Sequence, residues 1–193
     1  MGTNAGLFSS SLGKKYLMAI TGLFLCSFLI IHFLGNIALF TNPVQFNEYT
    51  RFMSSNPIIR VMEIVLVLGF LTHIIDAIIL TRANKKAQPV KYAMNKNKSS
   101  WYSRNMGLTG TIILVFLILH LQSFWYEYKF GEVLMTVDSN GNEIKDMFTI
   151  VKTAFSEWWY SAIYILAMIL LGSHLNHGFQ SAFQSVGLRH KKY

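Results

Sequence analysis

Four histidines lie one in each of four long apolar segments, and each stands in the second half of its segment: His32, His73, His120 and His174. An imidazole can coordinate a metal or carry a proton, so a histidine inside an apolar segment is a candidate for either chemistry. If the segments cross a bilayer alternately up and down, the first and third histidines share one level and the second and fourth share another. The spacing therefore predicts two facing pairs.

Distances along the helices support this pairing. At about 1.5 Å per residue, His32 and His120 lie roughly 24 and 21 Å from the basic end of their segments, whereas His73 and His174 lie roughly 12 and 9 Å from it. His177 follows His174 by three residues on roughly the same face, and depth hardly separates these two. Two neutral imidazoles can fill both axial positions of a haem iron, which leaves no position for dioxygen and implies one-electron transfer. The alternative for each histidine is a hydrogen bond to a neighbouring helix, but independent packing histidines have no reason to pair by depth.

The composition is that of a membrane protein. Of the 193 residues, 52% are hydrophobic and 13% are charged, whereas a soluble domain has about 25% charged residues. A hydrocarbon core of about 30 Å requires about 20 apolar residues per helix. Four stretches meet this requirement: 16–40, 58–81, 106–126 and 158–180. The sequence thus predicts an all-α integral membrane bundle with four transmembrane helices, which form a single domain over residues 1–193.

Basic residues predict the orientation of the bundle. Twelve of the 17 Lys and Arg residues fall at one side of the membrane, in the amino terminus, the connection after the second helix and the carboxyl tail: Lys14, Lys15, Arg82, Lys85, Lys86, Lys91, Lys96, Lys98, Arg104, Arg189, Lys191 and Lys192. By the positive-inside rule this side is cytoplasmic, so we expect a cytoplasmic-membrane protein with a cytoplasmic amino terminus. Topology and anionic lipid headgroups account for the net charge of +8, and no nucleic-acid partner is predicted.

Two Asn-Pro pairs mark helix starts on the opposite side. Asn42 followed by Pro43 combines an N-cap with a first-turn proline, and it predicts a short interfacial helix over residues 43–54. Asn56 and Pro57 start the second membrane helix in the same way.

The remaining connections are polar. Residues 134–137 and 143–148 flank an Asn-Gly turn and predict a small hairpin. The basic stretch 84–103 is predicted to have no regular structure. Cys26 lies inside the first helix. Because it is the single cysteine of the sequence, an intramolecular disulfide is excluded.

Four motifs resemble a known family. They are SSLGKK at residues 10–15, MAITG at 18–22, HFLGN at 32–36 and HLNHGFQSAFQSVGL at 174–188. Together with the His73 and His120 helices, they resemble the cytochrome b membrane-anchor subunit of succinate:quinone oxidoreductases, the succinate dehydrogenase and fumarate reductase group. The resemblance covers nearly the whole chain and is to the one-subunit, two-haem type.

This resemblance implies a ligand set. His73 and His174 would bind a proximal haem b near the cytoplasm, and His32 and His120 a distal haem b near the outer face. His177 would touch a ligand or a haem propionate without binding iron. The family has five membrane helices, of which this chain would contain four. A flavoprotein subunit and an iron–sulfur subunit would dock on the cytoplasmic side.

The resemblance also implies an activity, as a subunit of succinate:quinone oxidoreductase. Electrons would pass between the iron–sulfur subunit and membrane quinone, commonly menaquinone, while the dicarboxylate chemistry takes place in the flavoprotein. This chain would then have no catalytic residue of its own. The quinone site would lie near the distal haem, with Glu48 and Glu63 as candidate proton-transfer groups. The alternative for each carboxylate is a solvated surface position.

Asp76 is one turn from His73 on the same helix and is a candidate to orient its imidazole. Two other functional classes also remain open. One is a proton channel or transporter in which the histidines form a relay, and the other is a haem-free membrane anchor.

Overall fold

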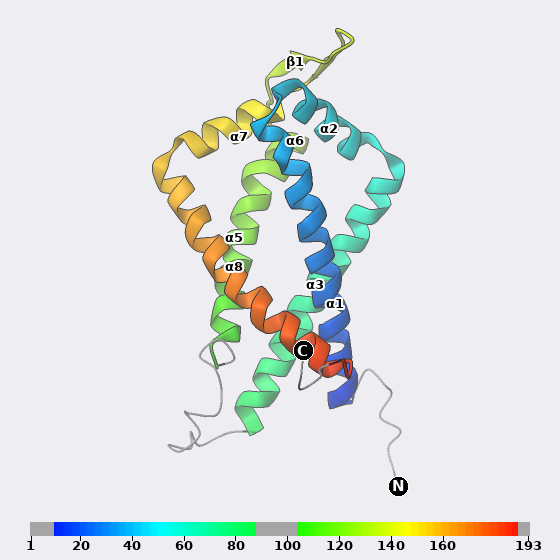
Figure 1. Cartoon of the computed structure of the whole chain (residues 1–193), viewed down its shortest axis with the longest axis vertical. Coiled ribbons are helices and arrows are strands. Elements are labelled where there is room, and N and C mark those ends of the chain that lie inside the picture. Colours follow the sequence, from blue (N-terminus) through cyan, green and yellow to red (C-terminus); the bar gives the residue numbers. More distant parts are fainter. Residues whose placement is uncertain (1–9, 88–103, 189–193) are drawn as a thin grey trace. The chain divides into compact units, whose positions relative to one another are not determined.

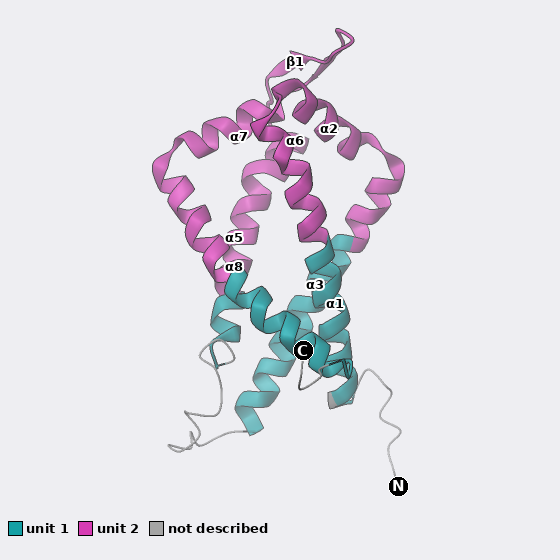
Figure 2. Cartoon of the chain, in the orientation of Figure 1, with its two compact units in different colours: residues 1–27, 66–110, 171–193 teal, residues 28–65, 111–170 magenta. Residues whose placement is uncertain are grey.

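The computed structural model describes residues 10–87 and 104–188, most of which are helical (Figure 1). The chain divides into two compact units, shown in Figure 2: unit 1 comprises residues 1–27, 66–110 and 171–193, and unit 2 comprises residues 28–65 and 111–170. Four helical spans are long and apolar enough to cross a membrane: Leu12–Phe40, Pro57–Ala87, Met106–Phe130 and Trp158–Ser185. The predicted all-α fold with four transmembrane helices is confirmed, and the spans indicate an integral membrane protein.

The four spans are built from the following helices: α1 (Ser11–Asn36) with the 3₁₀ turn η1 (Ile37–Phe40), α3 (Pro57–Ala87), α5 (Met106–His120) with the π-helical segment η3 (Leu121–Tyr126) and α6 (Glu127–Phe130), and α8 (Trp158–Ser185). Large apolar side chains on these helices are exposed, such as Phe33 at 68% and Ile58 at 73%. Such exposure is expected when the solvent around a helix is lipid.

The second membrane helix is longer than predicted. It continues beyond Thr81 to Ala87, so the prediction of no regular structure is wrong for residues 84–87. Lys85 and Lys86 lie in its last turn, where positive charge is favourable and long side chains can reach the headgroups. The rest of that predicted stretch, residues 88–103, lies outside the described residues. So do six of the basic residues used for the orientation: Lys91, Lys96, Lys98, Arg189, Lys191 and Lys192.

Both Asn-Pro helix starts are confirmed. The interfacial helix α2 spans Pro43–Ser55, and the Asn42 side chain accepts a hydrogen bond from the Val44 amide at 2.9 Å. The Asn56 side chain caps α3 in the same way, by accepting from the Ile58 amide at 2.9 Å. Each cap satisfies an amide that has no partner inside its helix.

The predicted hairpin is also present. Strands β1 (Met135–Val137) and β2 (Glu143–Lys145) pair in antiparallel orientation. Gly141 has a φ of +82°, a backbone conformation that glycine adopts without strain. The second strand is shorter than the predicted 143–148, because a helix begins immediately after it.

This helix, α7 (Met147–Ser156), was not predicted. Its N-cap is Asp146, whose carboxylate accepts from the Thr149 amide at 3.0 Å. Asn47 of α2 donates to Asp146 at 2.9 Å and accepts from the Phe148 amide at 2.8 Å. Asn47 therefore clamps α2 to the start of α7, and Figure 1 shows both helices and the hairpin at the same end of unit 2.

The core of unit 2 lies beneath this clamp. Phe46 of α2, Phe124 of η3 and Met147 of α7 are buried against one another. Because these three side chains come from distant parts of the chain, they tie the interfacial helices to the membrane span that carries His120.

In unit 1 the helices approach closely at glycines. Gly69 of α3 lies against Phe24 of α1, where an added Cβ would be 2.8 Å from the ring, and Gly178 of α8 lies against Met106 of α5. Small residues allow such approach between membrane helices. These contacts join α3, which carries His73, to α1, and α8, which carries His174, to α5.

Candidate functional site

His32 of α1 and His120 of α5 face each other in unit 2. Their ring centroids are 5.7 Å apart, and the ring planes are inclined at 84°. A metal–imidazole bond is about 2.0 Å long, so two imidazoles on opposite sides of one metal ion place their centroids about 6 Å apart. The separation of these rings thus fits two axial ligands of one haem iron.

Aromatic side chains pack against both rings of this pair. Phe28 stacks on His32 at a centroid distance of 5.4 Å, and Phe116 and Phe124 lie 5.9 and 5.4 Å from His120. His120 is half-buried among these rings, whereas His32 is exposed.

A tyrosine of α8 completes the surroundings of His120. The Tyr164 hydroxyl lies 3.0 Å from His120 Nδ1, and the Tyr160 hydroxyl lies 3.2 Å from that of Tyr164. A hydrogen bond at one ring nitrogen fixes the role of the other, so Nε2 of His120 is left available as a ligand.

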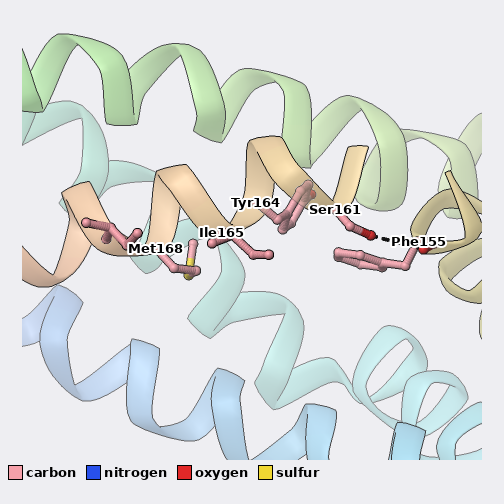
Figure 3. Close-up of a pocket in the computed structure, with 6 residues that line it drawn as sticks. Phe155, Ser161, Tyr164, Ile165 and Met168 are labelled. Carbon is pink, nitrogen blue, oxygen red and sulfur yellow. Dashed lines mark hydrogen bonds between the residues drawn. The ribbon is translucent and has the colours of Figure 1, made fainter. Parts of the chain in front are cut away.

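Tyr164 also borders an open apolar pocket of about 570 Å³, which Phe155, Ser161, Ile165, Met168 and Ile169 line with it (Figure 3). The Ser161 hydroxyl donates its hydrogen to the backbone oxygen of Phe155 at 3.0 Å. Tyr164 therefore connects the pocket to His120, because its ring lines the pocket and its hydroxyl lies beside the imidazole.

The second pair, His73 of α3 and His174 of α8, lies in unit 1, and the two residues are within electrostatic range of each other. Each ring lies against a glycine of a neighbouring helix. A Cβ added at Gly22 would be 3.5 Å from His73 Cε1, and one at Gly110 would be 3.4 Å from His174 Cε1. Any larger side chain at these glycines would extend into the space beside the imidazoles.

Thr21 of α1 fixes the tautomer of His73. Its hydroxyl oxygen lies 2.8 Å from the Leu17 carbonyl and 3.2 Å from His73 Nδ1. A hydroxyl has one hydrogen, and the Leu17 carbonyl takes it, so the Thr21 oxygen accepts from Nδ1–H of His73. Nε2 then carries the lone pair that a metal requires.

Asp76 does not take this role. The partner at His73 Nδ1 is Thr21, so the expectation that Asp76 orients His73 is wrong for this nitrogen. Asp76 is 4% exposed, and its Oδ2 has no hydrogen-bond partner among the described residues.

His174 differs from His73 at the same atom. Its Nδ1 is buried and has no hydrogen-bond partner within residues 10–87 and 104–188. Buried polar atoms are nearly always paired, so this unpaired atom is an exception. A histidine that served only to hydrogen-bond a neighbouring helix through Nδ1 would have a partner there. His177 is half-buried and within electrostatic range of His174. Its role beside the ligand stays a prediction.

Glu63 lies near the start of α3, ten residues before His73, and is held by three donors. It accepts from Arg60 at 2.7 Å, from the Trp125 indole at 2.6 Å and from Lys129 at 2.5 Å. These bonds attach α3 to η3 and α6. Proton transfer through Glu63 would require some of these donors to move.

Glu48 is engaged at the hairpin instead. It accepts from the Ser139 amide at 2.7 Å, and hydrogen bonds with Ser139 lower the pKa of the Glu48 carboxyl. Beside it, Arg51 pairs with Asp138 at 3.0 Å. The structure gives Glu48 and Glu63 separate sets of partners, and the role of either in proton transfer stays a prediction.

Sequence reasoning identified the histidines but missed the hydroxyls at their Nδ1 atoms. Thr21 had a signal, because a Thr-Gly pair recurs at residues 109–110, whereas Tyr164 had none, since it lies 44 residues from His120. No group of three or more His, Cys, Asp or Glu side chains that could hold a bare metal ion occurs in the described part of the chain. The chain matches no family model, no curated protein and no solved structure.

Proposed function

We propose that this chain is a di-haem cytochrome b that anchors a succinate dehydrogenase or fumarate reductase in the membrane. The observation that carries the proposal is the facing pair His32 and His120, at 5.7 Å and 84°. His73 and His174 provide a second pair, each ring lying against a glycine. The motifs at residues 10–36 and 174–188 support the assignment to this complex.

The side chains around the histidines have separate tasks in this proposal. Four imidazole nitrogens hold two haem groups, which supply one-electron transfer when bound. Thr21 and Tyr164 hold two of the rings by their Nδ1 atoms and make them stronger donors to iron. The phenylalanines that pack against His32 and His120 give that pair apolar neighbours.

The proposed partners occupy different faces of the chain. An iron–sulfur subunit and a flavoprotein subunit dock at the basic, cytoplasmic side, and the dicarboxylate chemistry stays in the flavoprotein. Quinone, commonly menaquinone in such complexes, exchanges electrons with the chain from the membrane. The open apolar pocket beside Tyr164 offers an apolar surface one residue away from His120, which suits a quinone ring.

One observation favours a second candidate, a proton channel. The hydroxyls of Tyr160 and Tyr164 and the His120 ring form a continuous hydrogen-bonded chain, which is a route for a proton. This candidate requires no chromophore, so an optical spectrum separates the two.

The test is the spectrum of the purified chain with its haem content. We expect two low-spin b haems per chain. His32→Ala and His120→Ala should remove one of them, and His73→Ala and His174→Ala should remove the other. His177→Ala is the matched control and should retain both. A protein without haem would contradict the proposal, and proton flux in liposomes with Tyr164→Phe would then test the channel. If His32→Ala and His73→Ala removed the same haem, the pairing would be wrong.

A further inference from the structure

Helices α1 and α5 carry the same pattern of three residue types. Each has a Thr-Gly pair, at residues 21–22 in α1 and 109–110 in α5, and in each a histidine follows the threonine by eleven positions. The two Thr-Gly pairs belong to unit 1, and the two histidines belong to unit 2.

The glycines of the two copies have the same surroundings. A Cβ at Gly22 would lie 3.5 Å from Cε1 and 3.9 Å from Nδ1 of His73. A Cβ at Gly110 would lie 3.4 Å from Cε1 and 3.9 Å from Nδ1 of His174. Each imidazole therefore presents the same edge to its glycine.

The threonines of the two copies are also alike in burial and bonding. Thr21 is 9% exposed and Thr109 is 3% exposed. Each directs its hydroxyl hydrogen to its own helix, Thr21 to the Leu17 carbonyl at 2.8 Å and Thr109 to the Met106 carbonyl at 3.1 Å. The hydroxyl oxygen of each is left free to accept one more hydrogen bond.

The copies also differ at the histidine nitrogen. His73 Nδ1 is bonded to Thr21, whereas His174 Nδ1 is buried without a partner among the described residues. We propose that the Thr109 hydroxyl is the acceptor for Nδ1–H of His174 when His174 binds iron, so that Thr21 and Thr109 are matched positioning residues on the two sides of one haem. The proposal rests on the proposed function and names two residues that tune the same site.

The chemical consequence follows from the direction of these bonds. An acceptor at Nδ1–H makes the imidazole more basic, and a more basic ligand stabilises the ferric state. Two such acceptors would lower the reduction potential of the haem bound by His73 and His174. Removing either hydroxyl should therefore raise that potential.

The experiment compares three variants that remove a hydroxyl and keep the side-chain shape: Thr21→Val, Thr109→Val and the control Thr72→Val. Thr72 is adjacent to His73 but bonds only the Leu68 carbonyl of its own helix, at 2.7 Å. Redox titration and electron paramagnetic resonance would follow both haems. We expect Thr21→Val and Thr109→Val to raise the potential of the haem that His73→Ala removes and to alter its resonance. Thr72→Val should leave both haems unchanged, and Thr109→Ser should restore wild-type values.

Two results would overturn the proposal. One is a wild-type potential and resonance in Thr109→Val while Thr21→Val shifts them. The other is loss of the haem in both Thr109→Val and Thr109→Ser. If Thr109→Val loses the haem and Thr109→Ser keeps it, the result supports the proposal. A wild-type protein without low-spin haem would contradict the proposed function itself. The spectrum of the wild-type protein gives that result without any variant, so failure of the proposed function is distinguished from failure of the Thr109 proposal.

Discussion

Tyr164 and Thr21 each place a hydroxyl oxygen beside Nδ1 of a histidine, at 3.0 and 3.2 Å. When Nε2 binds iron, Nδ1 carries the hydrogen, so both hydroxyls accept. The other partners of the two hydroxyls differ: Thr21 donates to the Leu17 carbonyl, whereas Tyr164 shares a hydrogen bond with the Tyr160 hydroxyl in which either oxygen can donate. Because a carbonyl and a phenol polarise the acceptor differently, the two proposed haems would have different potentials even with histidine ligands at both.

The first prediction concerns Tyr164. Tyr164→Phe should retain two haems and raise the potential of the one that His120→Ala removes, because the acceptor at Nδ1 of His120 is lost. Redox titration of the purified protein measures this shift. The control is Tyr126→Phe, since Tyr126 is 54% exposed. If only the haem that His73→Ala removes changed its potential, the assignment of Tyr164 to the His32 and His120 pair would be wrong.

At the scale of elements, local signals predicted the helix starts. Asn42 and Asn56 cap helices through bonds to residues two positions away, and such bonds depend only on neighbouring sequence. The start of α7 was missed because Asp146 is held in its capping position partly by Asn47, which lies 99 residues away. The same limit applies to the site. Depth along the helices paired the histidines, but the hydroxyl at His120 comes from another helix, which spacing does not reveal.

The second prediction is a loss of order in the hairpin turn at acid pH. Hydrogen bonds from Asn142, the backbone amides of Asn142 and Asn140, and the charge of Arg51 lower the pKa of Asp138. Its ordinary value is about 3.9. Since the folded pKa lies below the unfolded one, this stabilisation is present above the unfolded pKa and is lost as pH falls through the folded pKa.

Amide hydrogen exchange of Asn140 and Asn142 in micelles, from about pH 6 to about pH 2, measures this effect. We expect protection to decrease at the acid end. The control is Asp138→Asn, in which the decrease should be absent. Full protection of both amides at the lowest pH in the wild-type protein would contradict this account of the turn.

The third prediction concerns the contact between α1 and α3. Gly69→Val should destabilise the protein by about 1–3 kcal/mol relative to Gly172→Val, because overpacking forces neighbouring groups to move. A Cβ at Gly69 would be 2.8 Å from the Phe24 ring, whereas at Gly172 it would meet nothing within 4 Å. Reversible unfolding in mixed micelles measures the difference. Equal stability of the two variants would show that Phe24 can move freely.

At the scale of the whole molecule, each compact unit contains one histidine pair, His73 and His174 in unit 1 and His32 and His120 in unit 2. All four membrane spans contribute segments to both units. The two pairs thus have separate surroundings, although every membrane span passes through the surroundings of both. This arrangement underlies the expectation that removing one haem leaves the other bound.

The fourth prediction concerns orientation in the membrane. With Cys26→Ser as background, Asn140→Cys should react with a membrane-impermeant maleimide on intact cells, and Lys86→Cys should react only after lysis. The physical reason is the cluster of basic residues at the end of α3, which includes Lys85 and Lys86 and favours the cytoplasmic side. The opposite pattern of labelling would invert the orientation and place the hairpin in the cytoplasm.

The π-helical segment η3 sets the angle, around the helix axis, between His120 and the residues Trp125 and Lys129. His120 immediately precedes it, and Trp125 and Lys129, which bond Glu63, lie within and after it. A π-helical turn accommodates an extra residue, and one residue corresponds to about 100° of rotation in an α-helix. Deleting Ser123 should therefore swing Trp125 and Lys129 away from Glu63 while His120 still points at His32. The wide turn lets His120 and the two residues that bond Glu63 take independent directions on a single membrane span.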